Sequence, residues 1–335
     1  MKNKIRLSVL VLVAVLVSAV LVFARGTAEP DVITIRLGHG GAVDDLRQVA
    51  SEEFKRVVES ETDGRVIVEL YPASALGNWR EMQEGLQIGT TDIVIEDIGT
   101  LERYSDSAAL GFLPYTYLNR EHWERVWFDT EVGRDFVQEF EEETGFLLLG
   151  SMYRGARNLT AVRPVRARDD LEGLQIRIPG SLAAIKAWER LGAAPLSMDF
   201  PEVFGALEQG VIDAQENPFQ VIYYDSMYEV APYITLTEHV HGAFNFQFWG
   251  ETFDSWPEDV RAAVEVAAEQ ASRLYNDLID KEEQEILAKL YEMEDVDIIT
   301  LSDAEIRRWA EIVRPVREDY PRLADFFAAV DALAP

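Results

Sequence analysis

The feature that most constrains the fold is a regular alternation of strand-like and helix-like segments near the start of the chain. Residues 32–38, 65–71 and 92–95 are short runs rich in β-branched residues, which is typical of strands. Residues 44–60 carry apolar side chains at helical spacing, and Asn78 can cap a second helix. A strand–helix–strand–helix–strand order predicts a parallel sheet with helices on its faces.

The alternation returns in the second part of the chain. The predicted strands there are residues 146–152, 157–162, 174–178 and 194–196, with 235–249 extended, and the predicted helices are 181–191, 201–210, about 258–294, 302–317 and 320–333. The sequence contains no internal repeat and no low-complexity linker. We therefore expect an α/β fold of two lobes joined by ordered crossovers, with a cleft between them where small ligands usually bind.

The first residues have the order of a secretory signal peptide. Three basic residues among the first six precede an uncharged run at 7–23, and Ala24 supplies a small residue before the polar stretch. The alternative is a retained membrane anchor, but the run has 17 residues, which is the short end for a membrane span. We expect residues 1–24 to be a signal peptide and the mature chain to be periplasmic.

Composition excludes several classes of partner and chemistry. The chain has no cysteine, which excludes a disulfide, a thiolate zinc site, a cysteine nucleophile and the lipid attachment of a lipoprotein. Its formal net charge is −29, and removing residues 1–24, which carry three basic and no acidic residues, leaves −32. A field of this sign repels nucleic acid and anionic lipid surfaces, so we expect neither as a partner.

An arginine cluster is the strongest signal of a site in this acidic chain. Six arginines lie within 24 positions: Arg154, Arg157, Arg163, Arg166, Arg168 and Arg177. Arginine presents a planar fork that matches a carboxylate. The middle three have acidic neighbours and favour ordinary surface pairs. Arg177 differs because it lies inside a strand-like apolar segment, where a charge needs a partner, and a ligand carboxylate is one candidate.

The remaining motifs are weaker. Asn217 precedes Pro218, which favours an extended backbone that can turn the amide toward a cleft, although Asn-Pro also marks ordinary turns. His239 and His241 lie two apart, but no third metal ligand occurs at a recognisable spacing. Residues 38–41 (GHGG) begin like a dinucleotide-binding loop but lack its third glycine, and no hydrolase motif occurs. We expect no metal, no cofactor and no enzymatic activity.

Three blocks of the sequence resemble one family of transport proteins. Residues 70–93 (LYPASALGNWREMQEGLQIGTTDI), 173–180 (GLQIRIPG) and 201–218 (PEVFGALEQGVIDAQENP) are similar to blocks of the substrate-binding subunits of tripartite ATP-independent periplasmic (TRAP) transporters, of the C4-dicarboxylate-binding type. The blocks occur in the family's order and spacing. The resemblance implies a two-lobed periplasmic binding protein whose cleft closes on its ligand, with a long helix crossing both lobes.

The resemblance also implies which residues hold the ligand's carboxylate. Arg177 matches the family's arginine that forms a bidentate pair with this group. Arg157, twenty positions earlier, matches a second arginine of the pocket. Asn217 matches an asparagine that hydrogen-bonds the same carboxylate.

Further matches fall around the rest of the ligand. Phe200 matches an aromatic pocket position, and Asn78, Glu96 and Asp97 match first-lobe positions that touch the far end of the ligand. The carboxylates at Glu96 and Asp97 would accept hydrogen bonds from ligand hydroxyls. This favours a hydroxylated acid, such as a uronate or aldonate, over a plain C4-dicarboxylate.

The resemblance implies a role in uptake. The chain would capture a small carboxylate and deliver it to the small and large membrane subunits of a TRAP permease driven by an ion gradient. The family's lobes are discontinuous, so we expect lobe I at 31–152 plus about 243–283, and lobe II at 153–242 plus about 284–335. We expect a monomer. Two rival functions are a secreted enzyme that acts on a sugar acid and a binding protein that reports to a sensor.

Overall fold

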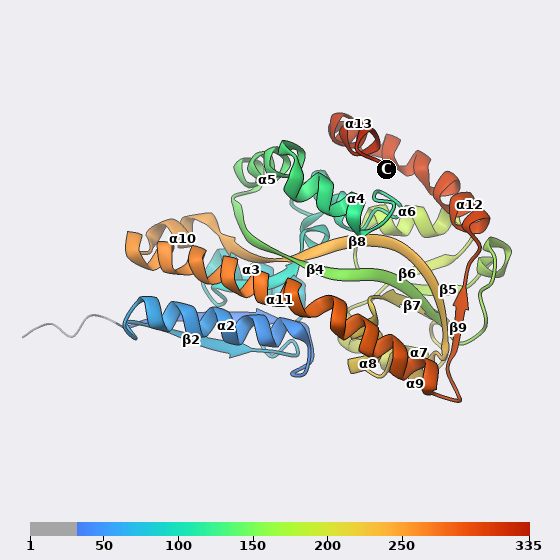
Figure 1. Ribbon diagram of the computed structural model, residues 1–335, viewed down its shortest axis with the longest axis horizontal. Coiled ribbons are helices and arrows are strands. Elements are labelled where there is room, and N and C mark those ends of the chain that lie inside the picture. The colour runs from blue at the N-terminus through green and yellow to red at the C-terminus, as the bar shows by residue number, and fades with distance from the viewer. Residues whose placement is uncertain (1–31) are drawn as a thin grey trace, which may run out of the picture. The chain divides into compact units, whose positions relative to one another are not determined.

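The computed structural model describes residues 32–335, so the predicted signal peptide at 1–24 lies outside the described residues. Residues 34–335 form one compact unit. Its strands form a single mixed sheet in the order β2-β1-β3-β8-β4-β7-β5-β6, with β9 paired to β8. Figure 1 shows helices on both sides of this sheet, as the alternating pattern predicts.

One end of the sheet is the predicted strand–helix–strand–helix–strand unit. It consists of β1 (Ile33–His39), α2 (Leu46–Glu61), β2 (Val66–Tyr71), α3 (Trp79–Ile88) and β3 (Ile93–Asp97). The strands β1 and β3 pair in parallel, which confirms the prediction for this part. Asp45 caps α2, and Asn78 and Glu81 form a reciprocal capping box at the start of α3.

The other end of the sheet is a second parallel group. Its strands are β5 (Gln175–Ile178), β6 (Ala194–Ser197) and β7 (Ala214–Asn217), with β5 between the other two. The helices around it are α6 (Leu182–Arg190), α7 (Val203–Glu208), α8 (Phe219–Tyr224) and α9 (Met227–Val230). The helix predicted at 201–210 is shorter than expected, because a 3-10 turn at Phe200–Glu202 precedes it.

Two long antiparallel strands join the parallel groups. They are β4 (Phe146–Ala161) and β8 (Tyr233–Trp249), which pair with each other and with β7 and β3 respectively. The prediction of two separate strands at 146–152 and 157–162 was wrong, because the chain continues through irregular pairing between them. Gly155 lies in this stretch at a φ of 82°, where a Cβ would collide with Glu283. Strand β9 (Asp297–Thr300) adds to β8 in parallel.

The long helix α11 (Glu258–Glu292) follows the short α10 (Gly250–Ser255) and confirms the helix predicted after Pro257. It packs on α2 in the first parallel group, on the central strand β4, and on α8 beside the second group. Figure 1 shows it running across β4. One helix therefore packs against a helix at each of the two parallel groups.

The sequence did not predict the elements between residues 98 and 144. They are two 3-10 segments (Ile98–Leu101 and Asp106–Gly111), α4 (Arg120–Glu124), a π-helical turn (Arg125–Asp129) and α5 (Glu131–Thr144). Short 3-10 and π turns lack the periodicity that identifies longer elements. The C-terminal helices are α12 (Asp303–Val313) and α13 (Ala324–Ala332), joined by 3-10 turns. Within residues 32–335, no helix is long and apolar enough to cross a membrane.

Candidate functional site: a cavity lined by four arginines

A cavity with an empty volume of about 670 Å³ lies where residues from the two parallel groups meet. Its walls come from β3, β4, β5 and β7, from the starts of α2 and α3, and from the loop that follows β6. Because the carboxyl ends of parallel strands are the usual place for a ligand in open α/β sheets, this position is the expected one. Four arginines line it: Arg47, Arg154, Arg157 and Arg177.

Arg177 projects from β5 with only 3% of its surface exposed. Its Nε donates to the carbonyl of Met198 at 2.9 Å, and its guanidinium lies 5.8 Å from the centre of the Phe200 ring. Among residues 32–335 it has no carboxylate within ion-pair distance. Burial and the neighbouring Arg157 lower its pKa to about 10, because both disfavour the charged form.

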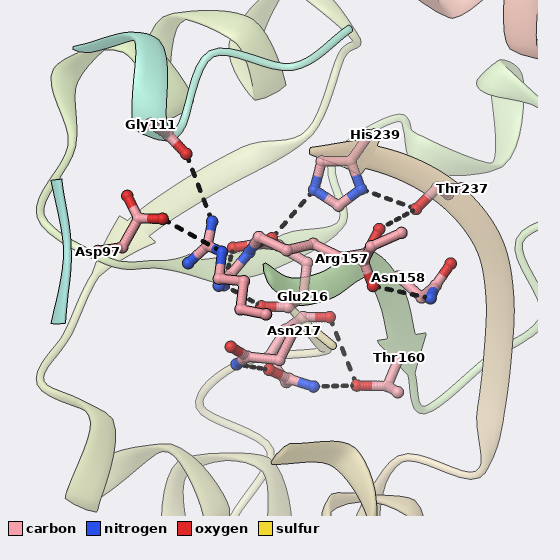
Figure 2. Close-up of polar contacts among 12 residues, drawn as sticks. Asp97, Gly111, Arg157, Asn158, Thr160, Glu216, Asn217, Thr237 and His239 are labelled. Carbon is pink, nitrogen blue, oxygen red and sulfur yellow. Dashed lines mark hydrogen bonds and ion pairs between the residues drawn. The ribbon is translucent and has the colours of Figure 1, made fainter. Parts of the chain in front are cut away.

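Arg157 has an anionic partner within the protein. It projects from β4 and pairs with Glu216 on β7, with 2.7 Å between Nη2 and Oε1. His239 lies 3.0 Å from the other oxygen of Glu216 (Figure 2). Burial alone would raise the pKa of Glu216, but Arg157 and His239 lower it to about 2, so the pair is ionised at neutral pH. The predicted second pocket arginine is therefore already neutralised.

The other two arginines also lie against a carboxylate, although Arg154 and Asp97 form an ion pair without a hydrogen bond between the paired atoms. Arg154 Nε lies 3.3 Å from Asp97 Oδ2, and both side chains are almost fully buried. Arg47 is bound by both oxygens of Asp45 at 2.9 and 2.7 Å. Three of the four arginines thus have a carboxylate of their own, and Arg177 is the one among them without such a partner in the part of the chain that the structure describes.

Glu96 is the carboxyl group that remains unpaired in the cavity wall. It lies at the end of β3, and its Oε2 is buried without a hydrogen-bond partner among the described residues. Burial raises its pKa to about 7, although Arg47 acts in the opposite direction. A carboxyl group with this pKa accepts hydrogen bonds from hydroxyls when ionised.

Asn217 and Phe200 lie beside Arg177 at the ends of the second parallel group. Asn217 is 6% exposed, and its Nδ2 donates to Gln215 at 2.5 Å, which leaves a second N–H on the same nitrogen. Figure 2 shows Asn217 next to Glu216, with the hydrogen bond to Gln215 drawn as a dashed line. Asn78 lines the opposite wall, but its oxygen caps α3 and its nitrogen donates to Asp199 at 2.9 Å.

Six of the seven predicted ligand-binding residues line this cavity: Asn78, Glu96, Arg157, Arg177, Phe200 and Asn217. Asp97 does not, because its carboxylate turns away to pair with Arg154. Sequence reasoning missed Arg47, Arg154 and Phe112 as cavity residues. Arg154 belongs to the arginine cluster that the sequence showed, but nothing in the sequence indicated that Phe112 packs under Arg154 and Arg157.

The two histidines considered as metal ligands are engaged elsewhere. His239 contacts Glu216 and Thr237, and His241 contacts Tyr153 at 2.8 Å. No group of three His, Cys, Asp or Glu side chains among residues 32–335 is placed to hold a metal ion.

A model of the family described as bacterial extracellular solute-binding protein, family 7, matches residues 37–322. The chain belongs to this family. A solute-binding protein of Roseobacter denitrificans is 34% identical over 263 residues, which is 78% of this chain and 80% of that protein. The 2,3-diketo-L-gulonate-binding periplasmic protein of Escherichia coli is 29% identical over 89% of this chain and 91% of its own length.

Solved structures agree with this membership. A TRAP periplasmic solute-binding protein from Roseobacter denitrificans with bound L-galactonate superposes with a TM-score of 0.83 at 30% identity, covering 90% of this chain and 99% of that chain. One from Haemophilus influenzae with bound L-gulonate gives 0.83 at 26% identity, covering 89% and 97%. The chain is therefore a member of the two-lobed TRAP solute-binding proteins, which confirms the predicted family and fold.

Proposed function

We propose that this protein captures a sugar acid with a single carboxylate and delivers it to a TRAP permease. The observation that carries the proposal is Arg177, a buried guanidinium that faces a cavity and has no carboxylate partner among the described residues. A buried charge without a partner is unfavourable, and a ligand carboxylate would supply the missing one. Asn217 would donate its second N–H to the same carboxylate.

The charge balance of the cavity supports a ligand with one negative charge. Arg47, Arg154 and Arg157 are each neutralised by a carboxylate of the protein, so they add little net attraction for a second anionic group. Glu96 would repel a second carboxylate but would accept hydrogen bonds from hydroxyls. These features favour a uronate or aldonate over a C4-dicarboxylate, which is the second candidate.

A hydrogen bond connects the two walls of the cavity in this structure. Asn78 at the start of α3 donates to Asp199 in the loop after β6. We propose that this bond forms when the lobes close on the ligand, and that the closed form is recognised by the small and large membrane subunits. The lobe boundaries predicted from the family place Asn78 in lobe I and Asp199 in lobe II, which is compatible with this role. We also propose that the mature chain acts in the periplasm.

A ligand panel tests the proposed function. Thermal unfolding of the chain without residues 1–24 should shift upward with sugar acids and stay unchanged with neutral sugars, amino acids and divalent metals. A ligand at a thousandfold its dissociation constant stabilises the folded state by about 4 kcal/mol, so the shift should be several degrees. Shifts confined to neutral sugars or metals would refute the assignment. If the bound acid is instead converted to a product during the incubation, the protein is an enzyme that acts on a sugar acid.

A further inference from the structure

A second cavity lies beside the ligand cavity, beyond the Arg154–Asp97 ion pair. Its empty volume of about 950 Å³ exceeds that of the ligand cavity. Asp97 and Gly111 line the second cavity, whereas Arg154, which contacts both, lines the ligand cavity. Figure 2 shows Asp97 and the Gly111 carbonyl directed at the same guanidinium. A single layer of side chains therefore separates the two spaces.

The walls of the second cavity are largely aromatic and aliphatic. Trp123, Trp127 and Phe128 come from α4 and the π-helical turn, and Tyr117 lies just before them. The Trp127 N–H donates to the Tyr117 hydroxyl at 3.0 Å, so these polar groups are satisfied. Val137 on α5 contributes an aliphatic wall. Polar and charged residues complete the lining: Asp97, Arg134, Gln138, Glu141, Ser151, His241 and Asn245. A cavity that combines an aromatic wall with a small number of polar groups is typical of sites for small organic molecules.

Two buried polar atoms of this cavity, Asp97 Oδ2 and His241 Nε2, lack a hydrogen-bond partner among the described residues, and only the first has an ion-pair partner. His241 lines the cavity with 4% of its surface exposed, and its Nε2 has no hydrogen-bond partner among residues 32–335. Its Nδ1 lies 2.8 Å from the hydroxyl of Tyr153. Burial lowers the pKa of His241 to about 4, so the ring is neutral at pH 7. We take the tautomer in which the Tyr153 hydroxyl donates to Nδ1, which leaves Nε2 as an N–H donor.

We propose that the second cavity binds a small uncharged aromatic molecule that accepts one hydrogen bond from His241, and that its occupancy weakens ligand capture in the neighbouring cavity. A planar ring would pack against Trp123 and Trp127, and a carbonyl or ether oxygen would satisfy Nε2. A charged molecule would lose its hydration without gaining a buried, unpaired counter-charge, because Asp97 is paired with Arg154, Glu141 accepts from the Leu148 N–H, and Arg134 is exposed and pairs with Glu131.

The coupling follows from the position of Asp97, and it rests on the proposed function. Asp97 lines the second cavity with 1% of its surface exposed. An apolar occupant would lower the dielectric on that side of the Asp97 carboxylate, so its negative field would reach further into the ligand cavity. An anionic ligand held by Arg177 would then bind less tightly, and by reciprocity the ligand would weaken binding of the aromatic molecule.

Fluorine NMR tests the site with three ring compounds of similar size. The probe 4-fluoroacetophenone carries an acceptor, 4-fluoroindole carries only a donor, and 4-fluorobenzoate is charged. We expect saturable line broadening for the ketone and at least about tenfold weaker binding for the other two, since an unpaired buried donor loses a factor of this order. Saturable binding of none of the three, or equal binding of the ketone and the indole, would overturn the site.

Substitutions locate the binding. Val137→Trp should fill the cavity and abolish broadening of the ketone signal, whereas Val266→Trp on the exposed side of α11 is the matched control and should leave it unchanged. If Val137→Trp does not fold, Gln138→Trp at an exposed position of the cavity wall replaces it. If the ketone signal still broadens in the folded cavity variant, either Val137→Trp or its replacement Gln138→Trp, the probe binds elsewhere and the proposal is refuted.

Calorimetry tests the coupling. The dissociation constant of the sugar acid found in the ligand panel should rise about fivefold or more when the ketone saturates the second cavity, and should not respond in Val137→Trp. An unchanged constant in the wild type would overturn the coupling. If no acid binds at all, the proposed function fails, while the NMR result still decides whether the second cavity is a site.

Discussion

At the residue scale, the site is defined by how its charges are paired. Arg47, Arg154 and Arg157 are each held by a carboxylate of the protein, and these pairs shape the cavity wall. Within residues 32–335, Arg177 is held only through the Met198 carbonyl and the Phe200 ring. Because its terminal nitrogens are left for the ligand, Arg177 should contribute more to affinity than the other three.

Substituting Arg177 by lysine tests this directly. Arg177→Lys keeps the positive charge but loses the fork that matches a carboxylate, so we expect a loss of about 2–5 kcal/mol in binding, or 30-fold to several thousandfold in affinity. Arg166→Ala is the control, because Arg166 pairs with Asp297 on the exposed surface. Titration calorimetry measures both. Near wild-type affinity in Arg177→Lys would show that the carboxylate is held elsewhere.

Glu96 should make binding depend on pH in opposite directions for two ligand classes. Its pKa is raised to about 7 without ligand. Hydroxyls that donate to Glu96 favour the ionised form, so binding of an aldonate releases a proton and should tighten several-fold from pH 6 to pH 8. A dicarboxylate disfavours that form, so its binding should weaken over the same range.

Glu96→Gln should remove both pH trends, and calorimetry at three pH values would show this. A dicarboxylate that binds the wild type more tightly at pH 8 than at pH 6 would contradict the proposed preference.

The sequence identified Arg177 because a charge inside an apolar strand needs a partner, and the matching family blocks pointed to the remaining cavity residues. It did not distinguish Glu96 from Asp97, which are neighbours at the end of one strand. Asp97 pairs with Arg154, which is 57 positions away in sequence and brought close only by the paired strands β3, β8 and β4. The residues next to Asp97 in the sequence therefore do not indicate that it pairs with Arg154.

At the element scale, a helix or strand could be predicted where its apolar residues recur at a regular spacing along the sequence. The first strand–helix unit and α11 have long, regular patterns, and the structure confirms them. The strand β4 was predicted as two, at 146–152 and 157–162, and Gly155, at a positive φ, lies in the gap between them. The segment from 98 to 144 depends on packing against β4, β8 and the C-terminal helices, which a local pattern does not show.

The C-terminal third of α11 carries two carboxyl groups that should make stability depend on pH. Burial raises the pKa of Glu282 and of Glu283 from 4.5 to about 7. Since the folded state holds these protons more tightly than the unfolded state, stability should fall as pH rises from about 4.5 to 7, by about 1–3 kcal/mol for each group.

Thermal unfolding between pH 5 and pH 8 checks this. In Glu283→Gln the unfolding temperature should fall by a few degrees less between pH 5 and pH 8 than in the wild type. In Glu285→Gln, at an exposed position of the same helix, it should fall as in the wild type. Parallel curves for all three proteins would mean that Glu283 does not titrate in this range.

At the scale of the whole molecule, the net negative charge repels the anionic ligand that the site is proposed to bind. The chain without residues 1–24 carries −32, which repels an anionic ligand, while Arg177 attracts it only at short range. The Debye length falls from about 30 Å at 0.01 M salt to about 8 Å at 0.15 M, so added salt screens distant surface charges more than contact pairs. Association should therefore become faster over this range, with affinity level or modestly tighter.

Stopped-flow fluorescence can follow this association, since Trp79 lines the cavity. A rate that drops steeply with salt would show that positive potential reaches well into solvent, and the arginines would then act as an open surface patch.

The most direct test of the central claim compares two ligands that differ only in the group that Arg177 is proposed to bind. Galactonate and galactitol share a six-carbon hydroxylated skeleton, but galactitol has a neutral CH₂OH in place of the carboxylate. If the panel confirms galactonate as a ligand, calorimetric titration should give at least a 30-fold higher affinity for galactonate, with most of that difference lost in Arg177→Lys. Should another sugar acid bind better, that acid and its own polyol form the pair. Equal affinities for acid and polyol would contradict the claim that this site captures a carboxylate.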